Sequence, residues 1–258
     1  MVKRKGSSKK KNTLIKNKYD LNIPKKDYPF VSVLTPTYNR SLFIPYLKKC
    51  FLNQEYPQEK MEWIIIDDGS EPVHDLFKDM SNVRYIYLDE KINIGAKRNM
   101  CNELAKGEIM VCMDDDDYYP PTRVSSAVKA LYKNSKFQLA GSSKIFLYYS
   151  DIKEIYEVGP YSANHCTNGT MAYTKEYAQN HKYDNYVTHA EESGFLENYK
   201  NPCFQLVPED VMMVMSHSHN TFDKRGMRDG KNRFVKRSKL SITNFIKDPE
   251  LLEFYRDV

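Results

Sequence analysis

Four apolar runs that alternate with segments of helical periodicity are the main feature of residues 30–133. The runs occupy Phe30–Thr35, Trp63–Ile66, Val83–Leu88 and Glu108–Met113. Short, nearly continuous apolar runs are typical of strands that are covered on both faces, as in a parallel sheet. Helices are expected in the connections, over residues 42–52, 71–80 and 95–105. This alternation predicts a doubly wound α/β sheet, in which ligands bind beyond the carboxyl ends of the strands.

Residues 134–258 have a less regular pattern. Strands are expected over residues 137–149, 155–158 and 211–215. We expect a mixed, partly antiparallel region that covers one side of the crevice and contributes a second substrate site.

The positive charge of the chain is concentrated at its N-terminus. The formal net charge is +5, but residues 1–26 contain ten Lys and Arg residues and a single acid, Asp20. The other 232 residues contain 29 basic and 33 acidic residues, so they are mildly acidic. Residues 1–27 lack apolar periodicity and are expected to form a disordered basic tail. Such a tail could contact nucleic acid or an anionic membrane, or could only increase solubility.

Composition argues against several other classes of protein. No segment approaches the roughly 18 consecutive apolar residues of a membrane span, and the N-terminus lacks the apolar segment of a secretory signal. The five cysteines are scattered and form no CxxC pair. This pattern argues against a zinc site and favours reduced thiols in the core. A cytoplasmic protein is therefore expected.

Four consecutive aspartates, Asp114–Asp117, follow the fourth apolar run and precede Pro120 and Pro121. The two prolines end the strand, so the four carboxylates are crowded at its terminus and repel one another. A divalent metal bound by oxygen ligands would compensate this repulsion. Taken alone, the run is more typical of a solvated acidic loop.

Two other strand ends also carry polar residues, Pro36–Arg40 and Asp67–Asp68. If the strands are parallel, their carboxyl ends lie at one edge of the sheet. The three polar sets would then form a single site.

Four motifs, taken in order, resemble the family 2 glycosyltransferases, which have the GT-A fold. The nucleotide loop, the DDGS turn, the helix before the metal strand and the DxD motif are matched by Val31–Arg40, Ile64–Ser70, Gly95–Asn99 and Asp114–Asp117. The resemblance covers residues 31–121, and the joint order of the motifs makes it specific. It implies one GT-A domain over residues 28–258, a Rossmann-like sheet with helices on both faces. Residues 28–133 would bind the nucleotide-sugar, and residues 134–258 would form the acceptor side.

The resemblance implies donor-side roles for individual residues. Asp68 would accept a hydrogen bond from the base, and its alternative is a turn-forming role before Gly69. Lys97 and Arg98 would contact the diphosphate near a helix N-terminus, unless they are merely solvated. The rest of the nucleotide-binding set would be Pro36, Thr37, Tyr38, Asn39 and Arg40. Within that set, Tyr38 would stack on the base or serve only in packing.

Within the acidic run, the resemblance gives each aspartate a different role. Asp114 would contact the ribose or a metal-bound water, and Asp115 is the variable middle position. Asp116 would bind Mn²⁺ or Mg²⁺, which bridges the diphosphate and stabilises the leaving group. Asp117 has no fixed role and could bond the backbone or a sugar hydroxyl.

An inverting transferase needs a base that deprotonates the acceptor hydroxyl. In the family an acidic pair at the start of a helix supplies it, and the segment His189–Leu196 is similar to that region. Glu192 is the expected base and Glu191 is the alternative. An ordinary acidic first turn of a helix is the third interpretation.

Two further segments carry weaker similarity to the family. His217 has the spacing to Asn220 and Thr221 of an HxxNT segment, and it would approach the metal or the diphosphate. His219 is the competing candidate, and a structural core histidine is the other interpretation. Cys166–Met171 resembles the strand that lines the donor sugar.

Together these expectations describe a metal-dependent, inverting glycosyltransferase of the hexosyltransferase type. It would transfer a sugar from a nucleoside diphosphate donor, expected to be UDP-linked, to a hydroxyl of a glycan, a protein or a small molecule. A sugar nucleotidyltransferase is a rival, but it should carry a Gly-rich basic loop after the first strand. A haloacid-dehalogenase phosphatase should carry its DxD motif on the first strand. A nucleic-acid-binding module that uses the basic tail is the non-enzymatic alternative.

Overall fold

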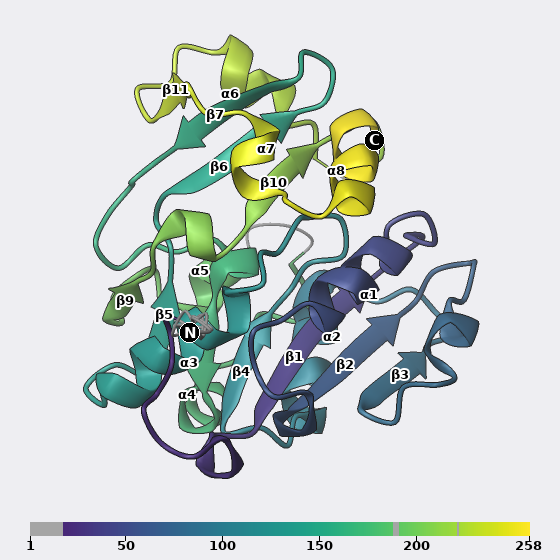
Figure 1. Ribbon diagram of the computed structural model, residues 1–258, viewed down its shortest axis with the longest axis vertical. Helices are drawn as coiled ribbons and strands as arrows, with labels where there is room; N and C mark the ends of the chain where they lie inside the picture. The colour runs from purple at the N-terminus through teal and green to yellow at the C-terminus, as the bar shows by residue number, and fades with distance from the viewer. Residues whose placement is uncertain (1–17, 188–190, 221) are drawn as a thin grey trace, which may run out of the picture.

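A seven-stranded sheet with the strand order β3-β2-β1-β4-β8-β5-β9 forms the larger layer of the computed structural model, which describes residues 18–187, 191–220 and 222–258 (Figure 1). Its strands are β1 Val31–Thr37, β2 Met61–Asp67, β3 Val83–Tyr87, β4 Ile109–Cys112, β5 Leu139–Gly141, β8 Ala172–Thr174 and β9 Cys203–Gln205. Strands β1 to β4 are parallel, whereas β8 runs antiparallel to both β4 and β5. The parallel half predicted from the four apolar runs is confirmed.

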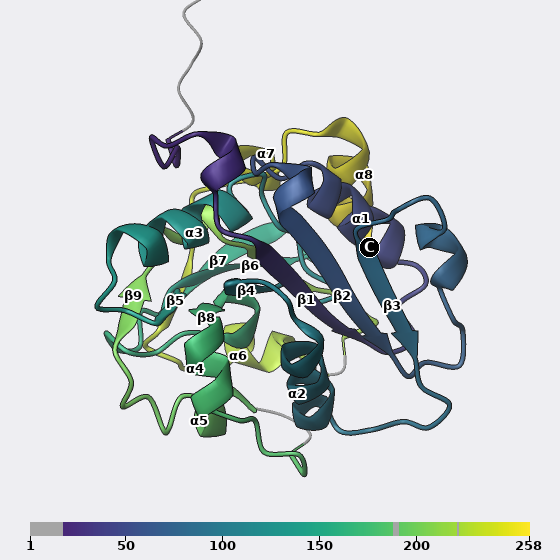
Figure 2. The same ribbon diagram turned by 90° about the horizontal axis from the view of Figure 1, so that it is seen from below.

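Helices cover both faces of this sheet because its central strands are apolar on both sides (Figure 2). They are α1 Ile44–Leu52, α2 Ile94–Leu104, α3 Arg123–Lys133, α4 Lys175–Asn180 and α5 Glu192–Phe195. Val33 and Ile65 belong to one core cluster with α1 and α3, whereas Leu34 and Ile64 belong to another with α2 and α4. Successive residues of a strand point to opposite faces, so one continuous apolar run supplies both clusters.

A smaller, four-stranded sheet has the order β10-β6-β7-β11 and lies above the first in Figure 1. Its strands are β6 Ile145–Tyr149, β7 Glu154–Val158, β10 Met213–Ser216 and β11 Val235–Arg237, and the helices beside it are α6 Arg225–Asp229, α7 Ile242–Phe245 and α8 Pro249–Asp257. Only the β10–β6 pair is parallel, so the mixed second half is confirmed. Helix α8 returns to α1, where the rings of Tyr46 and Phe254 stack with their centroids 3.5 Å apart.

Two expected elements differ from the structure. The helix expected over residues 71–80 is wrong, because only a short 3₁₀ helix, His74–Phe77, forms there. Pro72 disfavours a helical conformation at Glu71, and the chain must turn again before β3 begins. The strand expected over residues 137–149 is divided into β5 and β6, which belong to different sheets. The remaining 3₁₀ helices are Lys25–Asp27, Gln58–Lys60, Asn168–Thr170 and Pro208–Asp210.

The packed part of the chain begins before residue 28. Residues 1–17 lie outside the described residues, but Leu21 is only 1% exposed and belongs to the main core. The Tyr19 hydroxyl and the Lys18 ammonium both donate to the carboxylate of Asp210. Residues 18–27, which the charge pattern assigned to the tail, therefore pack on the domain.

All five cysteines are buried thiols, as expected from their scattered positions. Among the described residues, no helix has the length and apolar character needed to cross a bilayer.

Candidate functional site

The carboxyl ends of β1, β2 and β4 bring the three predicted polar sets together. Thr37 is the register partner of Asp67, and Leu34 is the partner of Cys112, two residues before Asp114. The loop after β1 packs directly on the turn after β2, because a Cβ on Gly69 would lie 2.6 Å from the Asn39 nitrogen. Only glycine fits there, which explains the DDGS sequence of the turn. Asn39 has φ 52° and accepts a hydrogen bond of 2.7 Å from the Ser70 N–H.

A buried chain of hydrogen bonds fixes the three strand ends to one another. The Trp63 indole N–H donates to the Thr35 hydroxyl over 2.9 Å, and that hydroxyl donates to the Met113 carbonyl over 2.7 Å. Met113 immediately precedes the aspartates. The acidic run is therefore held rigidly against β1 rather than lying in a solvated loop.

Asp68 and Lys97 form a buried ion pair beneath the loop after β1. The Lys97 ammonium donates to the Asp68 carboxylate and, over 2.9 Å, to the Thr37 carbonyl. The other Asp68 oxygen accepts the Ile92 N–H over 2.9 Å. The side chain of Asp68 is 0% exposed, so in this conformation its carboxylate faces the protein interior. Lys97 supports the loop instead of facing the crevice.

The remaining residues of the loop after β1 have distinct surroundings. Pro36 and Thr37 are buried in β1, whereas the Tyr38 ring is exposed. The Lys91 ammonium lies 3.7 Å from the centroid of the Tyr38 ring. An exposed ring beside a cation can accept a base by stacking.

Arg98 joins the two acidic clusters that were predicted separately. Its Nη2 donates to Asp114 Oδ1 over 2.9 Å, and its Nε donates to Glu191 Oε1 over 2.7 Å. Although burial opposes the charged form, the charges of Asp114 and Glu191 hold the pKa of Arg98 well above its ordinary value. The guanidinium thus fixes the end of β4 to the start of α5.

Arg40 lies between the next two aspartates. Its Nε is 3.5 Å from Asp115 Oδ1, and its Nη2 is 3.5 Å from Asp116 Oδ2. Burial and the neighbouring charge of Asp116 raise the pKa of Asp115 to about 7. The two arginines supply much of the cationic compensation that the acidic run requires.

Asp116 contacts residues from the second half of the chain. Its Oδ2 lies 3.6 Å from His217 Nε2 and accepts a 3.1 Å hydrogen bond from Asn220 Nδ2. Burial would raise the pKa of Asp116, but the adjacent His217 and the charges of Lys224 and Arg40 outweigh burial and lower it. Asp116 is therefore ionised at neutral pH.

His217 rather than His219 is placed beside the acids. The His217 side chain is buried against Phe43, with ring centroids 4.6 Å apart, whereas His219 is exposed. Burial lowers the pKa of His217, so its imidazole is neutral at physiological pH. Thr221, the last residue of the expected HxxNT segment, lies outside the described residues.

Asp117 turns away from the other three aspartates. Its Oδ1 accepts the Met215 N–H over 2.8 Å, and its carbonyl accepts the Tyr255 hydroxyl over 2.9 Å. Of the two roles considered for Asp117, the structure supports backbone bonding.

Glu191 and Glu192 stand at the start of α5, as expected, although the preceding His189 and Ala190 lie outside the described residues. Glu191 is buried and paired with Arg98. Glu192 is half-buried and has no ion pair with another described residue. Burial, with the charge of Glu191, raises the pKa of Glu192 above its ordinary value. A carboxylate that is partly desolvated and lacks a cation is suited to accept a proton.

The segment Cys166–Met171 forms a turn instead of the expected strand, since a 3₁₀ helix occupies Asn168–Thr170 and β8 begins only at Ala172. The turn still reaches the site, because a Cβ on Gly169 would lie 2.9 Å from Asp114 Oδ2. The local sequence Thr-Asn-Gly-Thr favours such a turn.

The donor groups present fit a hard divalent cation that is shared with a substrate. No cluster of three or more His, Cys, Asp or Glu side chains in the described ranges is arranged to hold a metal by itself. Asp116 and His217 nevertheless provide two adjacent donors, an ionised carboxylate and a neutral imidazole. Mg²⁺ is commonly held by one or two protein groups together with substrate phosphates and water.

Sequence reasoning missed Lys224 and the pairing of Arg98. The Lys224 ammonium donates to the Met215 carbonyl over 2.9 Å and lies close enough to Asp116 to lower its pKa. No motif marks this lysine, because its position depends on how β10 packs against the end of β4.

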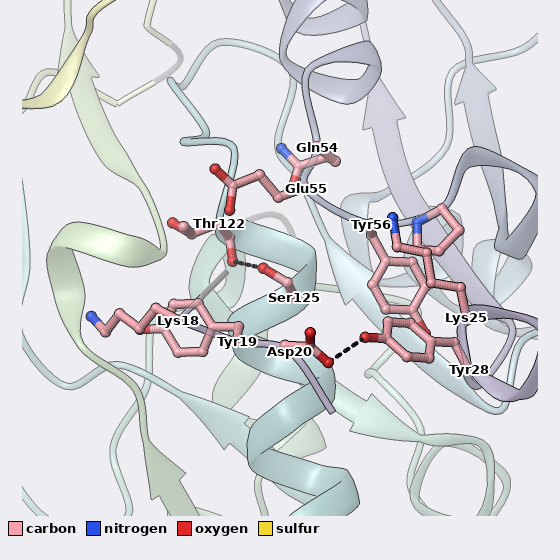
Figure 3. A pocket seen from close by; sticks show the side chains of 11 residues that line it. Lys18, Tyr19, Asp20, Lys25, Tyr28, Gln54, Glu55, Tyr56, Thr122 and Ser125 are labelled. Carbon is pink, nitrogen blue, oxygen red and sulfur yellow. Dashed lines mark hydrogen bonds between the residues drawn. The ribbon is translucent and has the colours of Figure 1, made fainter. Parts of the chain in front are cut away.

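A cavity of about 730 Å³ lies where the N-terminal segment meets α3 and the α1–β2 connection (Figure 3). Its walls include Tyr19, Tyr28 and Tyr56, and the Tyr28 hydroxyl donates to Asp20 over 3.1 Å. None of the predicted site residues lines it, so it is separate from the candidate site.

The part of the chain that carries the motifs matches a known family. The family described as "Glycosyl transferase family 2" matches residues 32–152. These residues belong to glycosyl transferase family 2. The family 2 domain includes Asp68, Arg98 and the four aspartates, whereas Glu192 and His217 lie beyond the matched residues.

Curated relatives of the family 2 domain include bacterial glycosyltransferases. WcaA of Escherichia coli, a glycosyl transferase named for colanic acid biosynthesis, is 35% identical over 105 residues, which are 39% of this chain and 37% of WcaA. TarS of Staphylococcus aureus, a poly(ribitol-phosphate) β-N-acetylglucosaminyltransferase, is 28% identical over 92 residues, which are 34% of this chain and 16% of TarS. This chain therefore matches less than half of the length of either relative.

Solved structures share the fold over most of the chain. The mannosyltransferase PcManGT from Pyrobaculum calidifontis, in complex with GDP-Man and Mn²⁺, has a TM-score of 0.60 at 17% identity and covers 80% of this chain and 62% of its own. TarS residues 1–349, in complex with UDP-GlcNAc, have a TM-score of 0.56 at 17% identity and cover 74% of this chain and 59% of that one. The GT-A fold expected from the sequence is confirmed.

Proposed function

We propose that this chain is a metal-dependent, inverting glycosyltransferase that moves a sugar from a UDP-linked donor to an acceptor hydroxyl. The observation that carries the proposal is the Arg98 bridge, which places the acidic pair of α5 beside the first aspartate of the DxD run. This contact supports one site at the carboxyl edge of the sheet, with the DxD run on the donor side and the acids of α5 on the acceptor side.

On the donor side, Asp116 and His217 would hold the metal. A divalent cation there would neutralise charge that develops on the diphosphate leaving group. Arg40 contributes a second positive charge at the same place, and Tyr38 offers a stacking surface for the base. The metal is supported by Mn²⁺ in the mannosyltransferase complex, and the UDP donor by UDP-GlcNAc in the TarS complex.

On the acceptor side, Glu192 would take the proton from the attacking hydroxyl. Its raised pKa makes it a stronger base than an ordinary glutamate, and the absence of an ion pair among its described neighbours leaves the carboxylate available. Glu191 would act indirectly, by keeping Arg98 and therefore Asp114 in place.

The proposal is tested by replacing Asp116. We expect Asp116→Ala to lower Mn²⁺-dependent release of nucleoside diphosphate from UDP-sugars by about 10²-fold or more, because a metal contributes several kcal/mol to leaving-group stabilisation. Asp75→Ala, which removes an exposed acid from a 3₁₀ helix, is the matched control and should keep the wild-type rate.

Near wild-type turnover in Asp116→Ala would contradict the assignment of this residue. Preferred turnover of GDP-sugars would overturn the UDP donor, and release of pyrophosphate instead of nucleoside diphosphate would identify a nucleotidyltransferase.

A further inference from the structure

A row of aromatic rings leads away from the α5 end of the site. The ring centroids of Tyr199 and His165 are 4.8 Å apart, those of His165 and Tyr161 are 4.7 Å apart, and those of Tyr161 and Phe234 are 4.9 Å apart. We call these four residues the aromatic row. It crosses from the segment after α5 to the loop after β7 and to the residue before β11, so it spans the junction of the two sheets.

The row begins in the segment that follows α5, the helix that starts with Glu192. Asn198, the residue before Tyr199, donates its N–H over 2.8 Å to the carbonyl of Ser193 in α5. This hydrogen bond holds the segment that carries Tyr199 against α5, the helix that starts with Glu192.

The backbone at Tyr199 has an unfavourable conformation. Glu197, Asn198 and Tyr199 are three consecutive non-glycine residues with positive φ, of 48°, 55° and 61°. Non-glycine residues adopt this left-handed conformation only rarely, so a run of three is unusual. The strained run lets the Tyr199 ring stack on His165 at an interplanar angle of 19°. Strain of this kind is concentrated at functional sites, where the surrounding structure maintains it.

His165 adds a second unfavourable feature. Its Nδ1 is buried and makes no hydrogen bond with any described residue. A buried polar atom without a partner is destabilising, so a purely structural position would be better filled by an apolar ring.

The loop that carries Tyr161 and His165 is built firmly. The Ser143 hydroxyl oxygen accepts the N–H groups of Tyr161 and Ser162 over 2.7 and 3.1 Å. Gln205 Nε2 donates to the carbonyls of Ala163 and His165 over 2.8 and 3.1 Å. Side chains of two other elements thus fix the rings in place.

The far part of the row is open to solvent. Tyr161 is 37% exposed and lines a cavity of about 390 Å³ together with Gln205 and Lys144. The Lys144 ammonium is already paired with Glu157 over 2.8 Å. Burial lowers the pKa of His165, so the row carries no charge at neutral pH.

We propose that the aromatic row is the acceptor subsite and that the acceptor is a neutral oligosaccharide. The inference rests on the proposed function, since it assigns the terminal sugar hydroxyl to Glu192. Pyranose rings present apolar C–H faces that pack on aromatic rings, and Tyr hydroxyls and backbone groups can bond their hydroxyls. Four successive rings offer more than one stacking position, which favours a chain of sugars over a single one. The Arg233 guanidinium lies over Phe234 at the far end of the row, 4.7 Å from the ring centroid. No cation–π contact to the other three rings occurs among the described residues, so the part of the row nearest α5 favours a neutral sugar over an anionic polymer.

The test compares acceptors and ring variants in the full chain. The acceptors are neutral trisaccharides of glucose, galactose and N-acetylglucosamine, an oligomer of glycerol phosphate, and a Ser/Thr peptide. We expect at least one trisaccharide to accept sugar, and we expect Tyr199→Ala and Tyr161→Ala each to raise its KM by about 10-fold, the scale of one lost aromatic contact. The donor KM and the slow hydrolysis of donor without acceptor should not change. Tyr161→Phe should restore the wild-type KM.

Tyr132→Ala is the matched control, because Tyr132 is 43% exposed on α3 and lies outside the row. Unchanged acceptor KM in both ring variants, or transfer only to the glycerol phosphate oligomer or the peptide, would overturn the inference.

Saturation-transfer NMR with the same trisaccharides separates this inference from the proposed function. If trisaccharides bind and Tyr199→Ala abolishes this binding, but the protein turns over no nucleotide-sugar, the saccharide site is supported and the transferase function is rejected. If the protein turns over a nucleotide-sugar but binds no trisaccharide, the transferase function is supported and the saccharide site is rejected.

Discussion

The four aspartates of the acidic run have different partners, and at the scale of single residues this difference decides what each can do. Asp114 is paired with Arg98, Asp115 lies beside Arg40, and Asp116 faces His217. Asp117 bonds the backbone of β10. The four adjacent aspartates thus include a partner of Arg98, an acid beside the charge of Arg40, a candidate metal ligand and an acceptor for the backbone of β10.

Glu192→Gln is expected to lower sugar transfer by about 10²-fold or more, the usual contribution of a general base. The base acts only when ionised, so the wild-type rate should rise with pH through the pKa of Glu192. Because that pKa is raised, the rise should occur at a higher pH than for an ordinary glutamate. Because glutamine does not ionise, the profile of kcat against pH for Glu192→Gln should lack this rise.

Stability provides the control for Glu192→Gln. A carboxyl whose folded-state pKa is raised stabilises the protein below its unfolded pKa, and this stabilisation is lost as pH rises through the folded pKa. At pH 7 the ionised Glu192 is therefore unfavourable, and the variant should have an equal or higher Tm. A lower Tm together with an unchanged pH profile would contradict the assigned role.

Motif spacing predicts roles for residues of a given type, such as Asp116 and His217, and these roles stay predictions. It could not identify the partners of Lys97 and Arg98, which were expected at the diphosphate. Lys97 instead pairs with Asp68, and Arg98 pairs with a glutamate 93 positions away. Such pairs depend on how α2 and α5 pack, and no local pattern encodes that packing.

Strand β10 is the element that connects the small sheet to the site, and Asp117 is its anchor. Asp117→Ala is expected to lower the free energy of unfolding by about 1–3 kcal/mol, because the buried Met215 N–H would lose its acceptor. Asp117→Asn keeps an acceptor oxygen and should lose less. Urea unfolding of both variants measures the difference, and an equal loss would show that the charge, rather than the hydrogen bond, matters.

At the scale of elements, strands were predicted correctly where apolar residues form a continuous run in the sequence. Strand β2 was predicted because Trp63–Ile66 is apolar on both faces. The supposed helix over residues 71–80 and the supposed strand at Cys166–Met171 failed because both segments are turns set by Pro72 and by Asn168–Gly169. Polar turn residues ended these segments before regular structure could extend.

For the molecule as a whole, the packed domain includes residues 18–27. Deletion of residues 1–17 is expected to leave sugar transfer and Tm unchanged, whereas deletion of residues 1–26 should lower Tm because it removes Leu21 from the core and Lys18 and Tyr19 from Asp210. Activity assays and thermal unfolding of both truncations measure this. Salt-sensitive nucleic-acid binding that disappears with residues 1–17, in a protein without transferase activity, would favour the nucleic-acid module instead.

The order of the large sheet's parallel half could be expected from alternating strands and helices, but the joining of the two sheets could not. That joining depends on contacts such as Tyr46 with Phe254, which are distant in sequence and follow no repeat.

The Arg98 bridge has a consequence for how the two substrates are handled. A single guanidinium neutralises one acid on each side of the crevice, so any ligand that draws it toward the diphosphate also alters the charge next to Glu192. A ligand in one half would therefore change the electrostatic environment of the other half. In the proposed transferase, a bound nucleotide-sugar should therefore change the affinity for the acceptor, and the acceptor should change the affinity for the nucleotide-sugar by the same factor.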